Sequence, residues 1–228
     1  MHMSNTHSVR LLILDLDGTL ADTLDALREA VNLTMRAYGW PEKTREDIRM
    51  AIGNGARMLI ARSMPFPKAQ DPALVDRVLR DYDRNYAQTY MHTRECYPGI
   101  PETLSKLCDR GYRLAVLSNK QDIFTKKLVR QLLGPLPSFV QGQTDMPKKP
   151  DPTVPLFIAK TLGFAPGMCA MIGDSDVDIQ TGRNAGMLTV GCAWGFRGTQ
   201  ALEEAGAEHI AQRPEDLLSI FPEVIKCS

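Results

Sequence analysis

The sequence has no excess of charge of either sign, because its 228 residues include 27 Lys and Arg and 27 Asp and Glu. Division of the chain at residues 21 and 95 reveals no basic arm and no acidic tail. Binding to nucleic acid or to an anionic membrane depends on a basic surface, so the charge balance argues against both kinds of partner. A charged ligand must therefore be bound by groups that the fold brings together locally.

The sequence also has few cysteines and no long hydrophobic segment. Its five cysteines form no CxxC pair, which argues against a disulfide framework and a zinc site and is typical of a reducing compartment. Residues 1–8 contain no apolar signal segment, and no later stretch approaches the roughly 18 uninterrupted apolar residues of a membrane helix. We therefore expect a soluble, cytoplasmic protein with no membrane partner.

What the sequence does contain is a succession of short apolar runs and amphipathic segments. The apolar run at 9–14 ends at a glycine turn, which predicts a buried strand. The segment that follows, up to residue 95, has helical periodicity and no convincing strand. Helices are predicted there over 22–38, over 45–51, from 54–56 to about 64, and over 72–91.

Beyond residue 97 strands and helices alternate, as in a parallel sheet that is covered by helices on both faces. The predicted fold class is therefore α/β, with a doubly wound, Rossmann-like parallel sheet and an inserted all-helical domain. The core would comprise residues 1–20 and 96–228, and the insertion residues 21–95. The alternating segments are strands over 113–117, 138–140, 168–172 and 189–192, and helices over 100–110, 122–133, 153–162, 177–185 and after 214.

Two pairs of carboxylates follow two of the predicted strands. Asp15 and Asp17 end the first strand, and Asp174 and Asp178 follow the fourth. Ligands of open α/β sheets bind outside the carboxyl ends of the strands, so these side chains are expected to converge. Carboxylates gathered without a cation raise one another's pKa, which predicts a bound hard metal ion. Mg²⁺ fits best, because no cluster of His or Cys suggests a softer metal.

Hydroxyl, amide and ammonium groups are predicted at the same edge of the sheet. Ser118, Asn119 and Lys120 end the second strand, and Lys148 and Lys149 lie in a proline-stiffened loop before the fourth. With the carboxylates they supply a nucleophile, an acid/base, a metal site, a hydroxyl donor and a cation. This set is suited to phosphoryl transfer, which needs in-line attack and neutralisation of the phosphoryl oxygens.

The sequence resembles the haloacid dehalogenase-like hydrolases, whose four motifs it matches in order and in spacing. The resemblance covers nearly all of residues 9–222, and the helical insertion is similar to the family's helical cap. The motifs are Asp15-x-Asp17-Gly18-Thr19, Ser118-Asn119, Lys149-Pro150 and Gly173-Asp174-Ser175-x-x-Asp178. Within the family the sequence is most similar to phosphoglycolate phosphatases, in the segments Ile52-Gly53-Asn54-Gly55-Ala56, Tyr97-Pro98-Gly99, Ser118-Asn119-Lys120 and Trp194-Gly195-Phe196.

This resemblance implies a role for each motif residue. Asp15 would attack phosphorus and become an aspartyl-phosphate, and Asp17 would protonate the leaving alkoxide and then activate water. Ser118 would hydrogen-bond a phosphoryl oxygen, and Lys149, rather than Lys148, would hold the charge of the nucleophile and the phosphate. The Mg²⁺ ion would be held by the Asp15 and Asp174 carboxylates and the Asp17 backbone carbonyl, with Asp178 in support.

Other residues are expected to contact the substrate without reacting. Gly53 and Asn54 precede a helix of the insertion whose N–H groups would face an anionic substrate, and Arg57 follows on that helix. Ordinary turn chemistry and a solvated helix face account for the same residues, so both interpretations stay open. Asn119 and Lys120 would approach the substrate from the core side.

The predicted function is Mg²⁺-dependent hydrolysis of a small phosphorylated metabolite, with 2-phosphoglycolate as the leading candidate. Asp17 favours a phosphate ester or anhydride, because dehalogenases and phosphonatases of the family lack an acid at that position. The alternatives are an inorganic pyrophosphatase, a sugar phosphomutase and a non-catalytic module that binds a phosphometabolite. The sequence is compatible with a monomer and with a homodimer, and it does not reveal which cap side chains set the specificity.

Overall fold

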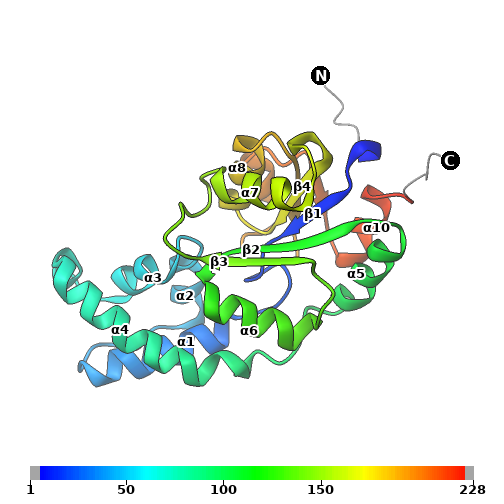
Figure 1. Cartoon of the computed structure of the whole chain (residues 1–228). Coiled ribbons are helices and arrows are strands. Elements are labelled where there is room, and N and C mark those ends of the chain that lie inside the picture. The colour runs from blue at the N-terminus through cyan, green and yellow to red at the C-terminus, as the bar shows by residue number, and fades with distance from the viewer. Residues whose placement is uncertain (1–5, 224–228) are drawn as a thin grey trace.

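A six-stranded parallel sheet forms the centre of the α/β part of the computed structural model, which describes residues 6–223 (Figure 1). Its strand order is β3-β2-β1-β4-β5-β6. The chain builds outward from β1 first in one direction and then in the other, which confirms the predicted doubly wound arrangement. The strands are β1 (Leu11–Leu14), β2 (Arg113–Gln121), β3 (Phe139–Gln143), β4 (Cys169–Gly173), β5 (Leu188–Cys192) and β6 (His209–Ala211).

Alternation along β1 divides its side chains between two layers of helices. Leu12 and Leu14 belong to one buried apolar cluster, and Leu11 and Ile13 to another. Successive side chains of a strand point to opposite faces, and here both faces are covered, so the strand is a continuous apolar run. One face carries α5 (Ile100–Asp109), α6 (Asp122–Leu133) and α10 (Leu217–Ile220), and the other carries α7 (Thr153–Leu162) and α8 (Asp176–Asn184).

The segment between β1 and α5 folds into four helices that pack on one another, hereafter the helical bundle. It has an apolar cluster of its own, which includes Val31, Ile60 and Tyr82 and also takes in Phe124 and Phe196 from the sheet part of the chain. In Figure 1 the bundle lies beyond the end of the sheet toward which β1 points. Its helices are α1 (Leu24–Ala37), α2 (Arg45–Ala51), α3 (Ala56–Ser63) and α4 (Pro72–Thr89).

Helix α4 shows how local sequence sets the start of a bundle helix. The Asp71 carboxylate accepts hydrogen bonds from the backbone N–H groups of Ala73 (2.9 Å) and Leu74 (3.2 Å), and Pro72 occupies the first helical position. The helix has 18 residues but carries charged side chains along its length. Within residues 6–223, every helix is too short or too polar to cross a membrane.

Most of the predicted elements are confirmed, but β2 is longer than expected. It runs to Gln121 rather than ending at residue 117, so that Ser118, Asn119 and Lys120 lie within the strand, where its register with β3 shifts. Strand β6 and helix α9 (Gly198–Glu204) escaped prediction. Strand β6 has only 3 residues, and the apolar residues of α9 are Ala201 and Leu202 alone, so neither segment shows an apolar period.

Candidate active site

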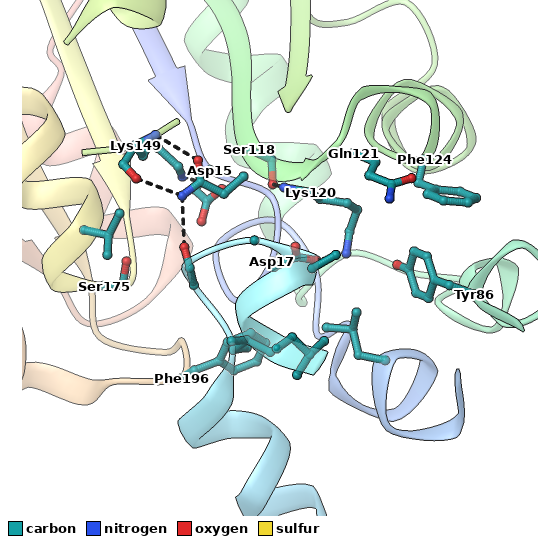
Figure 2. Close-up of a pocket in the computed structure, with 18 of the residues that line it drawn as sticks. Asp15, Asp17, Tyr86, Ser118, Lys120, Gln121, Phe124, Lys149, Ser175 and Phe196 are labelled. Atoms are coloured by element: carbon teal, nitrogen blue, oxygen red, sulfur yellow. Dashed lines mark hydrogen bonds and ion pairs between the residues drawn. The ribbon is translucent and has the colours of Figure 1, made fainter. Parts of the chain in front are cut away.

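The carboxyl ends of β1 and β4 meet where the strand order reverses, the position at which open α/β sheets bind ligands. Asp15 directly follows β1 and Asp174 directly follows β4, so the predicted convergence of these carboxylates is observed. A pocket lies here between the sheet and the helical bundle (Figure 2). Its lining includes most of the residues that the sequence predicts, namely Asp15, Asp17, Gly53, Ser118, Asn119, Lys120, Lys149 and Asp174.

Three buried carboxylates form an acidic cluster at the sheet side of this pocket. One oxygen atom each from Asp15, Asp174 and Asp178 lies within 4.8 Å of the others. Burial raises the pKa of Asp15 to about 7, and the attraction of Lys149 opposes this rise. Burial also raises the pKa of Asp174, and the neighbouring charges of Asp178 and Asp15 add to the effect. A divalent cation would stabilise the ionised form of such carboxylates.

Lys149 joins two members of the acidic cluster. Its ammonium lies 2.8 Å from Asp15 Oδ1 and 2.6 Å from Asp178 Oδ1, and its side chain is almost fully buried. Burial acts to lower the pKa of Lys149, but the two carboxylates outweigh it and raise that pKa, so the side chain stays charged. Asp178 Oδ2 in turn accepts hydrogen bonds from the backbone and hydroxyl of Ser175 at the start of α8, at 3.2 and 2.6 Å.

Asp174 is held through both of its oxygen atoms. Its Oδ1 accepts a hydrogen bond from the Thr19 hydroxyl (3.1 Å), and its Oδ2 accepts one from the backbone N–H of Phe196 (2.8 Å). Gly18 packs against the same carboxylate with φ +87°, and a Cβ atom there would lie 2.3 Å from Asp174 Oδ2. Glycine is therefore required at position 18 both by the backbone conformation and by the close approach of Asp174.

The donor set of the cluster fits a hard divalent cation. Asp15 and Asp174 offer oxygen atoms to the same space, and the cluster found among the described residues contains neither His nor Cys. One lysine balances only one of the three carboxylates, which leaves net negative charge at the site when all are ionised. Oxygen ligands and uncompensated negative charge are the conditions under which proteins bind Mg²⁺. Asp178, whose oxygen atoms contact Lys149 and Ser175, lies in the same cluster as the other two carboxylates.

Ser118 and Asn119 follow one another on β2 but have different surroundings. The buried Ser118 Oγ accepts a hydrogen bond from the backbone of Lys120 (3.2 Å), which leaves its hydroxyl proton to be donated into the pocket. The Asn119 amide group donates to the carbonyl oxygens of Gly53 and Lys149, each at 3.0 Å, and its oxygen accepts from Lys149 N (2.9 Å). The predicted substrate contact Asn119 is therefore occupied by the protein itself, and it joins the Lys149 loop to the helical bundle.

Asp17 is paired with a second buried lysine, Lys120. Lys120 Nζ lies 2.8 Å from Asp17 Oδ1, and the Thr23 hydroxyl donates to the same oxygen at 2.6 Å. Burial acts to lower the pKa of Lys120, but the charge of Asp17 and the contact with Tyr86 outweigh it and raise that pKa. The site thus holds two carboxylates in the turn after β1, each facing a different buried ammonium group.

Aromatic side chains form the wall of the pocket on the bundle side, and the sequence analysis did not identify them. Tyr86 meets Phe124 edge to face at 5.0 Å between ring centroids and stacks on Tyr82 at 5.7 Å. The two tyrosines are one helical turn apart on α4, the spacing of ordinary core residues, which conceals their place at the site. Figure 2 shows Tyr86 and Phe124 on the side of the pocket opposite Lys149.

Of the residues at and before the start of α3 that were expected to contact the substrate, only some line the pocket. Gly53 lines it. The carbonyl oxygen of Asn54 accepts a hydrogen bond from Lys148 Nζ (2.8 Å), so Lys148 contacts the bundle rather than the acidic cluster. Arg57 pairs with Asp76 at 2.9 Å on the exposed surface of the bundle and lies outside the pocket lining.

Arg197 is a pocket residue that the sequence analysis missed. Its Nη1 donates to the carbonyl oxygen of Arg49 (2.8 Å) and its Nη2 to that of Ile52 (2.9 Å), both at the end of α2. The signal available in the sequence is its position directly after Trp194-Gly195-Phe196. Phe196 holds Asp174 through its backbone N–H, so this short loop serves the acidic cluster and the bundle together.

Comparisons with known proteins agree with this geometry. The family model described as haloacid dehalogenase-like hydrolase matches residues 12–192. A phosphoglycolate phosphatase of Pseudomonas syringae pv. syringae (strain B728a) is 33% identical over 218 residues, which are 93% of this chain and 79% of that protein. A phosphoglycolate phosphatase of Aquifex aeolicus (strain VF5) is 31% identical over 219 residues, covering 93% of this chain and 97% of the relative.

A solved structure shares the architecture over almost its whole length. It is a protein of Lactobacillus delbrueckii subsp. bulgaricus assigned as a phosphoglycolate phosphatase, with a TM-score of 0.86 and 30% sequence identity. The similarity covers 93% of this chain and 98% of that one. The sheet and the inserted helical bundle are therefore both found in the related structure.

Proposed function

The chain belongs to the haloacid dehalogenase-like hydrolases and is a phosphatase, and we propose that it hydrolyses 2-phosphoglycolate with Mg²⁺ through a phosphorylated Asp15. The observation that carries this proposal is the pairing of two carboxylates with two buried lysines, Asp15 with Lys149 and Asp17 with Lys120, each at 2.8 Å. Carboxylates in different surroundings suit a reaction that uses one as nucleophile and the other as acid and base.

In the first half of the reaction, a carboxylate oxygen of Asp15 attacks phosphorus while the bond from phosphorus to the ester oxygen breaks. Asp17 Oδ1 faces Lys120 and Thr23, so the proton that Asp17 gives to the leaving oxygen would be carried on its other oxygen, and the leaving group departs as an alcohol. Asp15 is buried and held by Lys149, so it is oriented before the substrate arrives. Ser118 lies at the pocket wall, where its hydroxyl would donate to a phosphoryl oxygen.

In the second half, Asp17 takes a proton from a water molecule whose oxygen attacks phosphorus. The bond between Asp15 and phosphorus breaks, inorganic phosphate leaves, and both carboxyl groups return to their starting states. Asp17 is about one-fifth exposed, whereas Asp178 is fully buried, so of these two carboxylates Asp17 is the one that can reach water.

The proposed Mg²⁺ would be held by the carboxylates of Asp15 and Asp174 and the backbone carbonyl of Asp17, with Asp178 in support. When bound, it supplies positive charge against the phosphoryl oxygens. Lys149 would add positive charge at the same place, because its ammonium lies 2.8 Å from Asp15 and 2.6 Å from Asp178. Exclusion of bulk water by the helical bundle strengthens each of these interactions.

The choice of 2-phosphoglycolate is supported by the relatives that are phosphoglycolate phosphatases and by the position of the bundle. Three core side chains bind backbone carbonyls of the bundle, namely Asn119 at Gly53, Lys148 at Asn54, and Arg197 at Arg49 and Ile52. These contacts hold α2 and the loop before α3 against the mouth of the pocket. A small leaving group suits a site that is covered in this way.

The wider organisation is part of the same proposal. We take residues 21–95 as a cap over a core of residues 1–20 and 96–228, because the helices of this segment share one apolar cluster that faces the site. The protein would act in the cytoplasm on a small phosphorylated metabolite, as a monomer or a homodimer. On the cap side Gly53 remains a candidate substrate contact, whereas Asn54 and Arg57 lie outside the pocket lining.

The proposal is tested by phosphate release from 2-phosphoglycolate, pyrophosphate and hexose phosphates, with Mg²⁺ and with EDTA. We expect the highest kcat/KM for 2-phosphoglycolate, loss of activity in EDTA, and recovery when Mg²⁺ is restored. Borohydride trapping followed by mass spectrometry should find the modified residue at Asp15, and Asp15→Asn should be inactive. Asp176→Asn, a matched change at an exposed carboxylate, is the control. Turnover in EDTA, or preference for pyrophosphate, would contradict the proposal.

A further inference from the structure

We propose that Lys120 and Tyr86 form a binding subsite for a carboxylate on the substrate's leaving group. This inference rests on the proposed function, because 2-phosphoglycolate carries a carboxylate one methylene carbon away from its ester oxygen. The subsite joins a core strand, β2, to a bundle helix, α4, across the pocket. It would distinguish an anionic leaving group from a neutral one of the same size.

Lys120 has the charge and the position that such a subsite requires. Its buried ammonium lies 2.8 Å from Asp17 Oδ1, and in the proposed reaction Asp17 gives its proton to the ester oxygen. A carboxylate one methylene carbon from that oxygen would therefore lie close to Lys120. An ammonium group has three donors, of which one is used by the ion pair with Asp17 and one by the contact with the Tyr86 hydroxyl. The ammonium can therefore bind Asp17 and a ligand oxygen at the same time.

Tyr86 supplies an unused donor at the same place. The side chain is only 2% exposed, and its hydroxyl contacts the Lys120 ammonium but has no acceptor for its own proton among the described residues. Lys120 Nζ lies 4.9 Å from the centroid of the Tyr86 ring, but an ammonium cannot accept the hydroxyl proton. Figure 2 shows this hydroxyl turned toward Lys120 and the pocket. A buried hydroxyl without an acceptor is costly, and a ligand carboxylate would supply the acceptor.

The other cations near the pocket are already engaged. Lys149 is bound to Asp15 and Asp178, and both terminal nitrogens of Arg197 donate to backbone carbonyls of the bundle. Lys120 is thus the cationic side chain of the pocket lining that lies beside Asp17, where the leaving group would be.

One further carboxylate, Asp83, lines the pocket and would repel an anionic ligand if it were ionised. It accepts a hydrogen bond from the Gln121 side chain (2.7 Å), and burial raises its pKa. The hydrogen bond from Gln121 lowers the pKa of Asp83, but burial, which favours the neutral carboxyl group, has the larger effect.

The experiment compares 2-phosphoglycolate with ethyl phosphate, in which a methyl group replaces the carboxylate. The measured quantity is the ratio of the two kcat/KM values in the Mg²⁺-loaded enzyme. Tyr86→Phe removes only the hydroxyl, and we expect this ratio to fall about tenfold, mainly through KM for 2-phosphoglycolate. Lys120→Met should reduce the ratio further, about a hundredfold, in addition to any loss of rate with both substrates through Asp17.

Tyr90→Phe is the matched control, because Tyr90 lies one helical turn beyond Tyr86 and outside the pocket lining. Its ratio should equal that of the wild type. If Tyr86→Phe and Lys120→Met slow both substrates in equal proportion, these residues only position Asp17 and the subsite is wrong. If the wild type does not prefer 2-phosphoglycolate to ethyl phosphate, the proposed substrate is itself wrong. The two failures are thus distinguishable.

Discussion

Arg197 donates a hydrogen bond to Arg49 across the boundary between the sheet and the helical bundle, and Arg49 donates one back to Phe196, the residue before Arg197. Arg197 Nη1 donates to the carbonyl oxygen of Arg49 (2.8 Å), and Arg49 Nη1 donates to the carbonyl oxygen of Phe196. A second nitrogen of Arg197 binds the carbonyl oxygen of Ile52. One loop after β5 therefore both supports Asp174 and holds the end of α2 at the pocket.

Replacement of Arg197 should weaken the docking of the bundle without unfolding the protein. Arg197→Leu removes two hydrogen bonds across the boundary, so the docked arrangement becomes less populated and KM for 2-phosphoglycolate should rise about tenfold. Steady-state kinetics and a thermal melt measure the two effects separately. Arg183→Leu is the control, because Arg183 donates to the Ala205 carbonyl (3.3 Å) within the sheet part of the chain. An unchanged KM in Arg197→Leu would show that docking does not depend on this side chain.

The neighbouring lysines 148 and 149 provide a second matched pair. Lys149→Met leaves Asp15 and Asp178 buried without their cation, and it should lower the free energy of unfolding of the metal-free protein by about 3–5 kcal/mol. Lys148→Met removes one exposed contact with the bundle, at a cost of about 1 kcal/mol or less. Denaturant titrations in EDTA measure both. Equal losses in the two variants would mean that Lys149 is not held by the carboxylates as the structure shows.

The loss in Lys149→Met should also depend on pH. The unpaired carboxylates can take up protons at low pH, which removes their charge and with it most of the cost. The difference from the wild type should therefore be larger at about pH 8 than at about pH 5.

The acidic cluster predicts how stability depends on pH and on Mg²⁺. Burial raises the pKa of Asp15 to about 7 and that of Asp174 above its usual range. The folded, metal-free protein thus holds protons that the unfolded chain has lost, so this contribution to stability falls as pH rises from about 4 to about 7. Mg²⁺ binds the ionised cluster and stabilises the fold by mass action, so its effect on Tm should grow over the same range.

Thermal melts with EDTA and with Mg²⁺, from about pH 5 to about pH 7.5, measure this dependence. Asp174→Asn should abolish most of the increase in Tm that Mg²⁺ produces, because one of the proposed metal ligands loses its charge. An Mg²⁺ effect of the same size at every pH would contradict the assignment of the cluster as the metal site.

Alanine substitutions at Gly18 and Gly39 separate the effect of a steric clash from the effect of backbone conformation. Both have positive φ, +87° and +65°. The backbone conformation alone should therefore make alanine at either position lower the free energy of unfolding by about 1–2 kcal/mol. A Cβ at residue 39 would have no neighbour within 4 Å, whereas one at residue 18 would lie 2.3 Å from Asp174 Oδ2. Gly18→Ala should therefore also reduce the Mg²⁺ affinity, measured by calorimetry, and Gly39→Ala should not. Equal Mg²⁺ affinity in the two variants would show that Asp174 adjusts freely.

The parts of the fold that the sequence predicts well are those with long apolar periods or carboxylates at strand ends. The runs around β1 and β4 place Asp15 and Asp174 at one sheet edge, and that prediction needs only the rule for parallel strands. Helices α2, α6 and α7 begin and end where their patterns indicate. Strand β6, with 3 residues, offers too little pattern to be recognised.

The contacts between the bundle and the sheet could not be predicted in the same way. Arg197 binds backbone carbonyls more than 140 residues earlier in the chain. Every residue has a backbone carbonyl, so the sequence does not indicate which one accepts the hydrogen bond. Tyr86 has the spacing of a core residue and is indeed buried, and only its hydroxyl, whose proton has no acceptor among the described residues, sets it apart. Arg57, expected near the substrate, pairs instead with Asp76, because their distance depends on how α3 and α4 pack.

The extension of β2 to Gln121 has a consequence for how new substrate ranges can evolve on this scaffold. Two consecutive residues of β2 both contact other parts of the site. Asn119 binds Gly53 and the Lys149 loop, and Lys120 holds Asp17 beside the pocket. A substitution at Asn119 or Lys120 would disturb contacts in the α/β core as well as at the pocket. A substitution at Tyr86 on α4 would affect the α/β core less. Relatives that have diverged toward other phosphate esters should therefore differ mainly on the pocket side of α4 and keep the end of β2.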